Sequence, residues 1–171
     1  MEYKYLKFYP VGVDISEMYV HTYTNGHKHE EAIRKKWFEE WEHYCKENNK
    51  NVEERYYVYA YLDPRWKNSI EKYRLGSYLF DSPVFYVGKG MANRFGHHIH
   101  EIGNSLKHQV IQLIRKELNR RPIIMKLNDF LTEQEAFDVE QYLIECGGRL
   151  NKYEGCLTNK VAGNGKSKWN I

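Results

Sequence analysis

The sequence predicts an α+β fold, in which a small three-stranded mixed or antiparallel sheet is flanked by helices and preceded by an N-terminal extension of strands and one helix. Three observations lead to this class. Residues 56–62 and 84–87 are apolar and aromatic runs of strand length, and a third run, 123–127, follows Pro122. Apolar residues recur at helical spacing before, between and after these runs. At 171 residues, the chain is long enough for one domain and a small appendage.

The composition is that of a globular protein. Hydrophobic residues make up 42% and charged residues 29% of the chain, and no run of about 18 apolar residues occurs. The net charge of +3 permits a polyanionic partner without demanding one. The three cysteines, Cys45, Cys146 and Cys156, are odd in number and lack C-x-x-C spacing. With no signal-peptide pattern at the start, we expect a cytoplasmic protein that does not associate with a membrane.

Residues 1–55 are the predicted extension. Segments 3–13 and 18–23 have strand character, and Asn25-Gly26 is a turn signal. From 30 to 47, apolar side chains recur at helical intervals between lysines and glutamates. These side chains are Ile33, Trp37, Phe38, Trp41, Tyr44 and Cys45. An Asn-rich stretch at 48–51 ends the helix, so residues 56–171 are expected to form the main domain.

The first two strands carry tyrosines that we expect to meet. A period of two places Val58, Ala60 and Leu62 on one face of the first strand, and this small aliphatic face is expected to meet the core. The tyrosines at 57, 59 and 61 then lie on the other face. If the strands pair as an antiparallel hairpin, Tyr59 and Tyr86 share a face of the sheet.

A glycine-rich turn follows the second strand. Gly88 and Gly90 allow the backbone to approach a ligand closely. A short helix over 91–100 then places Arg94 and His98 four residues apart on one side, with His97 as the alternative. A longer helix over 105–119 is expected to bury a stripe of apolar residues. This stripe consists of Leu106, Val110, Leu113, Ile114 and Leu118.

The last predicted helix has the clearest boundaries in the chain. Thr132 and Glu135 match a capping box at its start, and Gly147-Gly148 supplies a stop at its end. Within the helix, Glu140 points where the apolar residues point. A carboxylate in such a stripe is unfavourable unless a positive charge compensates it. Glu140 is therefore a candidate functional residue.

These residues suit the hydrolysis of a phosphodiester. The reaction needs an activated water, positive charge beside the phosphate and stabilisation of the leaving oxygen. A lone carboxylate such as Glu140 can fix one Mg²⁺, which keeps most of its water ligands. Arg94 can hold phosphate oxygens bidentately, and Lys89 adds a charge that lowers the pKa of a neighbouring phenol. Tyr59 or Tyr86 could then orient or deprotonate the attacking water.

The ordered set resembles the GIY-YIG nuclease family over residues 56–160, with Tyr57-Val58-Tyr59 and Tyr86-Val87-Gly88 in the places of its two motifs. The resemblance implies a three-stranded mixed sheet flanked by helices and DNA cleavage with one divalent cation. It also implies that Tyr59 and Tyr86 are the motif tyrosines and that Glu140 binds the metal. Arg94, His98 and Asn159 match the arginine, histidine and late asparagine of the family.

Two features depart from the family pattern, and two others are similar to particular subgroups of the family. Tyr57 replaces the first glycine, and we expect its side chain to face outward. The connection 63–83 is longer than usual. Asp63-Pro64-Arg65 and Gly88-Lys89-Gly90 are similar to the subgroup related to LEM-domain nucleases, and Lys89 has a counterpart in small GIY-YIG restriction enzymes.

We therefore expect a DNA endonuclease that depends on Mg²⁺ or Mn²⁺ and is restriction-like, phage-encoded, or a branched-DNA or repair nuclease. The expected catalytic residues are Tyr59, Tyr86, Lys89, Arg94, His98 and Glu140, with Glu140 as the metal ligand. The expected substrate-binding residues are Gly88, Gly90, Asn159 and Arg65. The extension is expected to contact DNA or to form the interface of a homodimer.

Other interpretations fit the same residues. The domain could bind nucleic acid without cutting it, or cut RNA, because phosphate contacts carry little information about the sugar. Glu140 could form a structural ion pair with Arg94, and the tyrosines could serve packing alone. A structural zinc site formed by His21, His27, His29 and Cys45 has irregular spacing and is the weakest alternative.

Overall fold

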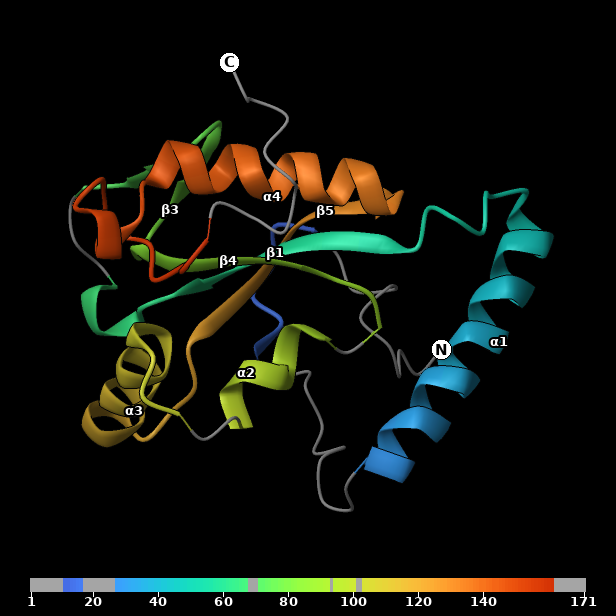
Figure 1. Ribbon diagram of the computed structural model, residues 1–171, viewed down its shortest axis with the longest axis horizontal. Coiled ribbons are helices and arrows are strands. Elements are labelled where there is room, and N and C mark those ends of the chain that lie inside the picture. Colours follow the sequence, from blue (N-terminus) through green and yellow to red (C-terminus); the bar gives the residue numbers. More distant parts are fainter. Residues whose placement is uncertain (1–10, 17–26, 68–70, 93, 101–102, 162–171) are drawn as a thin grey trace.

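The computed structural model describes residues 11–16, 27–67, 71–92, 94–100 and 103–161. Figure 1 shows a central sheet with helices on both faces and one helix, α1, at its side. The elements in order are α1 (His27–Asn48), β1 (Tyr56–Leu62), η3 (Pro64–Trp66), β2 (Tyr73–Leu75), β3 (Tyr78–Phe80), β4 (Val84–Gly90), η4 (Arg94–Gly96), α2 (His97–His100), α3 (Leu106–Leu118), β5 (Ile123–Leu131), α4 (Glu133–Gly147) and η5 (Leu150–Lys152).

The main sheet has three strands in the order β4-β1-β5, and both pairings are antiparallel. The predicted α+β class with a three-stranded antiparallel sheet flanked by helices is therefore confirmed. Tyr59 lies opposite Gly88 and Tyr61 opposite Tyr86 in the β1–β4 register. The rings of Tyr59 and Tyr86 are 6.2 Å apart between centroids, so the two tyrosines share a face as predicted.

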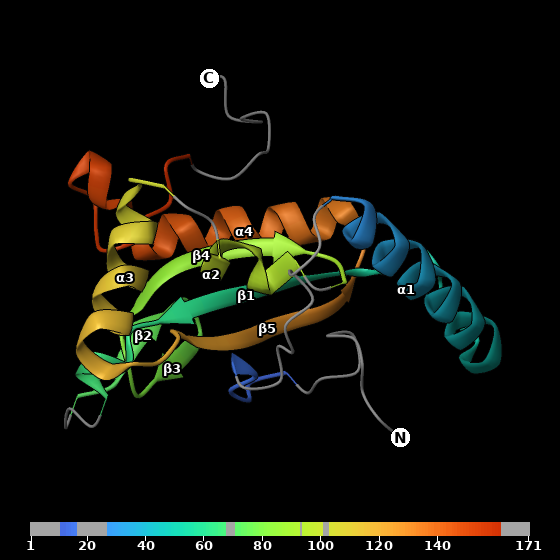
Figure 2. The same ribbon diagram turned by 90° about the horizontal axis from the view of Figure 1, so that it is seen from below.

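Both faces of the sheet are buried. Helix α4 covers one face and packs on Val58, Ala60 and Leu62 of β1. Helices α2 and α3 cover the other face, as Figure 2 shows from below. The expectation that Tyr57 faces outward is wrong, because its side chain is 1% exposed beneath η4 and α2. Because α2 and α3 cover the tyrosine face of the sheet, the tyrosines belong to a second hydrophobic core.

Helix α1 packs against the turn that follows β4. Its Trp37 and Trp41 are buried with Cys45 and Ala92, and Met91 lies against the same cluster. The indole Nε1 of Trp41 donates to Val52 O over 2.8 Å, which ties the helix to the chain before β1. The helix is four residues longer than predicted in total, because it begins at His27 and ends at Asn48.

Residues 11–16 of the extension lie beside β5. Gly12 N and Ile15 N donate to carbonyl oxygens of β5, and the Ile15 side chain is fully buried in the tyrosine-side core. The predicted strand segments 3–13 and 18–23 fall almost entirely outside the described residues. In the part of the chain that is described, no helix combines the length and the apolar character needed to cross a lipid bilayer.

The long connection after β1 contains a hairpin of β2 and β3, in which Gly76 adopts a φ of +58°. The predicted stripe of α3 is wrong in part. Ile111 and Ile114 are its buried residues, whereas Leu106, Leu113 and Leu118 are 37% to 42% exposed.

Candidate active site

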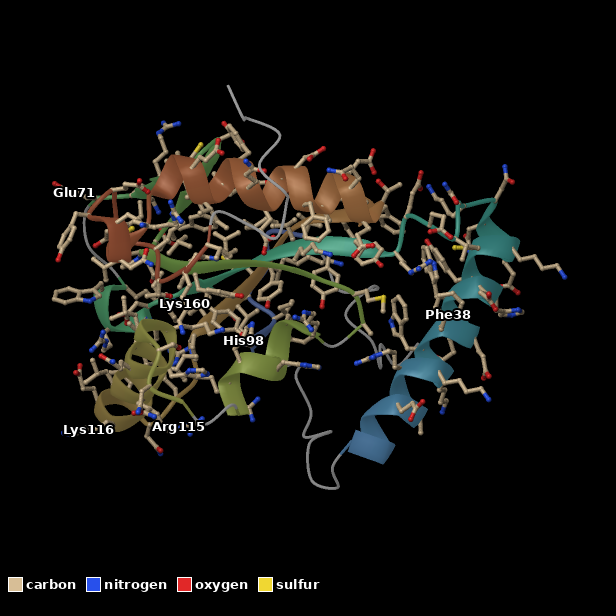
Figure 3. The ribbon with its side chains drawn as sticks, viewed as in Figure 1. Phe38, Glu71, His98, Arg115, Lys116 and Lys160 are labelled. Carbon is tan, nitrogen blue, oxygen red and sulfur yellow. The ribbon has the colours of Figure 1, made fainter. Side chains whose placement is uncertain are left out.

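A cleft of about 650 Å³ lies where β4, α2, α3 and α4 meet the segment after η5. Most of the predicted site residues line it together. They are Tyr86, Lys89, Gly90, Arg94, His98, Glu140 and Asn159. Further residues come from the start of β1, the turn after β4, α3 with its N-cap, α4 and the last described segment. They are Tyr56, Met91, Ser105, Lys107, His108, Glu133, Phe137, Ile144, Thr158, Lys160 and Val161. Figure 3 labels two of the lining residues, His98 on α2 and Lys160 between α3 and α4.

Glu140 supplies the buried carboxylate of the cleft. The capping box of Thr132 and Glu135 is present and fixes the start of α4, which places Glu140 two turns further along, facing β4. Its Oε1 accepts a hydrogen bond of 3.1 Å from Lys89 N, and the side chain is 9% exposed. Burial raises the pKa of this carboxyl, and the hydrogen bond and the charges of Lys89 and Arg94 oppose that rise.

This donor set fits a hard divalent cation with few protein ligands. Within the described residues, no group of three or more His, Cys, Asp or Glu side chains could hold a metal ion. Glu140 is the buried carboxylate of the cleft, and it would hold such a cation together with water and phosphate oxygens, as suits Mg²⁺.

Arg94 lies on a turn that two buried tyrosines hold in place. Tyr57 Oη donates to Ala92 O over 2.8 Å and accepts from Phe95 N over 3.2 Å, and Tyr61 Oη donates to Phe95 O. The Arg94 side chain is exposed at the cleft. Tyr57, which replaces the family glycine, thus fixes both sides of the arginine turn. No sequence pattern indicated this contact.

Gly88 and Gly90 serve close packing. A Cβ at Gly88 would lie 2.7 Å from Tyr59 Cζ, and Gly88 does not line the cleft. A Cβ at Gly90 would lie 2.9 Å from Arg94 Cβ and 3.0 Å from Tyr57 Oη. Both glycines therefore admit tyrosine rings from β1, and only Gly90 also reaches the cleft.

Tyr86 and His98 form a hydrogen-bonded pair in the cleft. Tyr86 Oη and His98 Nε2 are 3.1 Å apart, and the rings meet edge to face at 5.2 Å. This pair can pass a proton between a phenol and an imidazole. Tyr59 lies behind it, fully buried and away from the cleft, and burial raises the pKa of its phenol well above the ordinary value.

The Lys89 side chain turns toward α4. Its Nζ lies 2.9 Å from Glu133 Oε1 and 3.6 Å from the centre of the Phe137 ring, with the Tyr56 ring on another side at 5.0 Å. The ion pair with Lys89 lowers the pKa of Glu133. Lys89 therefore donates its backbone N–H to Glu140, while its ammonium group is paired with Glu133.

Asn159 and Arg65 are held by other residues of the chain. The Asn159 amide accepts from Val87 N at 3.1 Å and donates to Val87 O at 2.7 Å, which fixes the last described segment along β4. Arg65 does not line the cleft. Its guanidinium pairs with Asp63 at 2.7 Å and with Glu117 at 3.0 Å, joining η3 to α3.

Several lining residues were not among the predicted site residues, in particular Ser105, Lys107, His108 and Lys160. Nothing in the sequence showed that residues 158–160 return to β4, where Thr158 and Asn159 bind Phe85 and Val87. Of the proposed zinc ligands, Cys45 is buried among the tryptophans of α1. His21 and the side chains of His27 and His29 lie outside the described residues.

Comparison with known proteins agrees with this arrangement. Residues 56–170 match the profile of the LEM-3-like GIY-YIG domain. No curated protein and no solved structure matches the chain. The matched residues include β1, β4 and α4, which carry the tyrosines, Lys89 and Glu140 of the cleft. Because the match covers more than half of its length, the chain belongs to the LEM-3-like GIY-YIG family of nucleases.

Proposed function

We propose that this nuclease is a DNA endonuclease that uses a single divalent cation, Mg²⁺ or Mn²⁺. The observation that carries the proposal is the meeting of Glu140 and Arg94 in one cleft beside the Tyr86–His98 pair. These groups supply a cation site, a phosphate clamp and a proton acceptor. Phosphodiester hydrolysis needs all three.

Glu140 would hold the cation, and Lys89 N orients the carboxylate through its hydrogen bond. Bound there, the cation would supply positive charge against the oxygens of the scissile phosphate. Arg94 binds non-bridging oxygens of the same phosphate, because a guanidinium matches their geometry bidentately. Tyr57 and Tyr61 hold the turn that carries Arg94, and this turn positions the guanidinium.

The Tyr86–His98 pair takes the proton of the attacking water. The water gives its proton to Tyr86 Oη while the phenol gives its own to the unprotonated Nε2 of His98, which becomes an imidazolium. The water oxygen then bonds to phosphorus, the bond to the leaving oxygen breaks, and the leaving oxygen takes a proton from solvent. We propose that Tyr59 supports this pair by packing beneath Gly88 and Tyr86, since it does not reach the cleft.

We also propose that the chain has two functional parts, an extension at residues 1–55 and the nuclease domain at 56–171. Trp37 and Trp41 of the extension pack on Met91 and Ala92, just before Arg94 in the chain. The extension then acts on the site by supporting the arginine turn.

One such cleft cuts one strand, so a double-strand break needs a homodimer or a second encounter.

The first test is incubation of the full chain with supercoiled and branched DNA, each with Mg²⁺ and with EDTA. Glu140→Gln should abolish cleavage because it removes the charge that holds the cation and little volume. Glu145→Gln makes the same change on the exposed side of α4 and should cut like the wild type. Turnover by Glu140→Gln in Mg²⁺ would contradict the metal assignment, and cleavage of a matched RNA alone would contradict the DNA assignment.

A further inference from the structure

A second cleft opens from the candidate active site. It has a volume of about 520 Å³ and lies between the first residues of α3 and the segment after η5. Its lining residues are Asn104, Ser105, Leu106, Asn151, Thr158 and Lys160. Ser105, Thr158 and Lys160 line both clefts, so the two clefts adjoin, and together they are called the trough below.

The charges differ along this trough. The catalytic cleft contains two carboxylates, Glu133 and Glu140, whereas the residues that line the second cleft include no carboxylate. Lys107 stands near the junction, with its Nζ 4.5 Å from the centre of the Tyr86 ring. Lys160 stands where the two clefts join. Among the residues that line the second cleft, Lys160 is the one with a charge, and the others are Leu106 and four amide or hydroxyl residues.

The wall that carries Lys160 is anchored to the domain. Thr158 N and Oγ1 both donate to Phe85 O, over 2.7 and 2.8 Å, and Asn159 binds both backbone groups of Val87. Asn151 Nδ2 donates to Lys160 O over 3.4 Å, which joins η5 to the same segment. On the opposite wall, Ser105 Oγ lies 2.7 Å from His108 Nδ1. Hydrogen bonds thus shape the trough without a ligand.

We propose that the second cleft binds the DNA nucleotides that flank the scissile phosphate on one side, with Lys160 of this cleft and Lys107 of the adjoining active-site cleft against their backbone phosphates. The inference rests on the proposed function, because an internal cut leaves a strand on both sides of the active site. Apart from Leu106, the lining consists of ammonium, amide and hydroxyl groups without a carboxylate, and such groups are suited to phosphate contacts. Such contacts hold the strand without reading its sequence.

Affinity measurements test the subsite without cleavage. Fluorescence anisotropy of labelled DNA in EDTA is measured at several salt concentrations for Lys160→Gln, Lys107→Gln and the control Lys116→Gln. Lys116 lies toward the far end of α3 and lines neither cleft, as Figure 3 shows. Each cleft variant should weaken binding several-fold and reduce the salt slope by about one. Lys116→Gln should change neither quantity.

A second measurement locates the contact. Single methylphosphonate linkages, which remove one phosphate charge, are placed in turn on each side of the cut. At one linkage the wild type should lose affinity several-fold while Lys160→Gln loses none further. Wild-type affinity of Lys160→Gln, or additive losses at every linkage, would overturn the proposal. Failure of the proposed function would instead appear as no cation-dependent cleavage by the wild type.

Discussion

The two faces of β1 are buried to the same extent but hold the site in different ways. Val58, Ala60 and Leu62 on one face and Tyr57, Tyr59 and Tyr61 on the other are all 2% exposed or less. The aliphatic face packs against α4 through apolar contact, which has no preferred direction. The tyrosine face adds hydroxyl groups, and two of them hold the turn on either side of Arg94.

Each face therefore delivers one half of the cleft. Glu140 comes from α4 on the aliphatic side, whereas Arg94 and His98 come from η4 and α2 on the tyrosine side. Glu140 is positioned within a well-capped helix of 15 residues. Arg94 starts a 3-10 helix of three residues, and side-chain hydroxyls of β1 hydrogen-bond to the backbone on both sides of it.

Among the changes that test the two sides of the cleft, removal of the Arg94 side chain should lower the cleavage rate most. Arg94→Ala takes away the charge on the tyrosine side of the cleft, and loss of one such group from an active site typically lowers turnover by roughly 100- to 1000-fold. Steady-state cleavage of a plasmid in Mg²⁺ measures the change. Arg120→Ala, an exposed arginine just after α3, is the matched control. Near-normal turnover by Arg94→Ala would place the phosphate clamp elsewhere.

The role of the tyrosine hydroxyls can be tested by a pair of changes on adjacent residues of β1. Tyr57→Phe leaves Ala92 O and Phe95 N without this partner, which costs about 1–3 kcal/mol of unfolding free energy. Displacement of the arginine turn should also lower kcat by roughly ten- to a hundredfold, with a smaller change in KM.

Val58→Ala on the aliphatic face is the matched change. It should lower the unfolding free energy by a similar amount, about 1–3 kcal/mol, through lost burial. Well below the melting temperature its kcat should equal that of the wild type. Thermal melts and cleavage rates are measured for both variants. Equal losses of kcat would mean that Tyr57 acts only through stability.

Much of the fold was predictable because local signals agreed with the final packing. The capping box of Thr132, the stop at Gly147 and the strand-length runs all belong to elements that the structure confirms. The tyrosine face was misjudged for a physical reason. Alternation in a strand separates two faces but does not say whether a helix covers the second, and here α2 and α3 cover it.

The site was predictable only where its residues follow one another closely or match a motif. Tyr86, Lys89, Arg94 and His98 lie within one stretch, and the structure brings them to one cleft. The segment carrying Lys160 depends on a return of the chain from α4 to β4, which no local pattern encodes. The clamp of Asn159 on Val87 likewise joins residues 72 positions apart.

The smallest predicted effect is a pH dependence of stability on the Glu140 side of the cleft. Because burial raises the pKa of Glu140, the native carboxyl holds its proton more tightly than the unfolded chain does. This preference for the protonated form stabilises the native state fully below the unfolded carboxyl pKa of about 4.3. The stabilisation is lost as the pH rises through the raised native pKa. Above that value, in the absence of a cation, the buried charge opposes folding.

Glu140→Gln removes this charge and should therefore match the stability of the wild type near about pH 4 and exceed it near about pH 8. Thermal melts of both proteins in EDTA across this range measure the difference. Mg²⁺ should then raise the melting temperature of the wild type alone, since only its carboxylate binds the cation. If the difference between the two melting temperatures stays constant with pH, the Glu140 carboxyl does not titrate in the native cleft over this range. The charges of Arg94 and Lys89 would then suffice to keep it ionised.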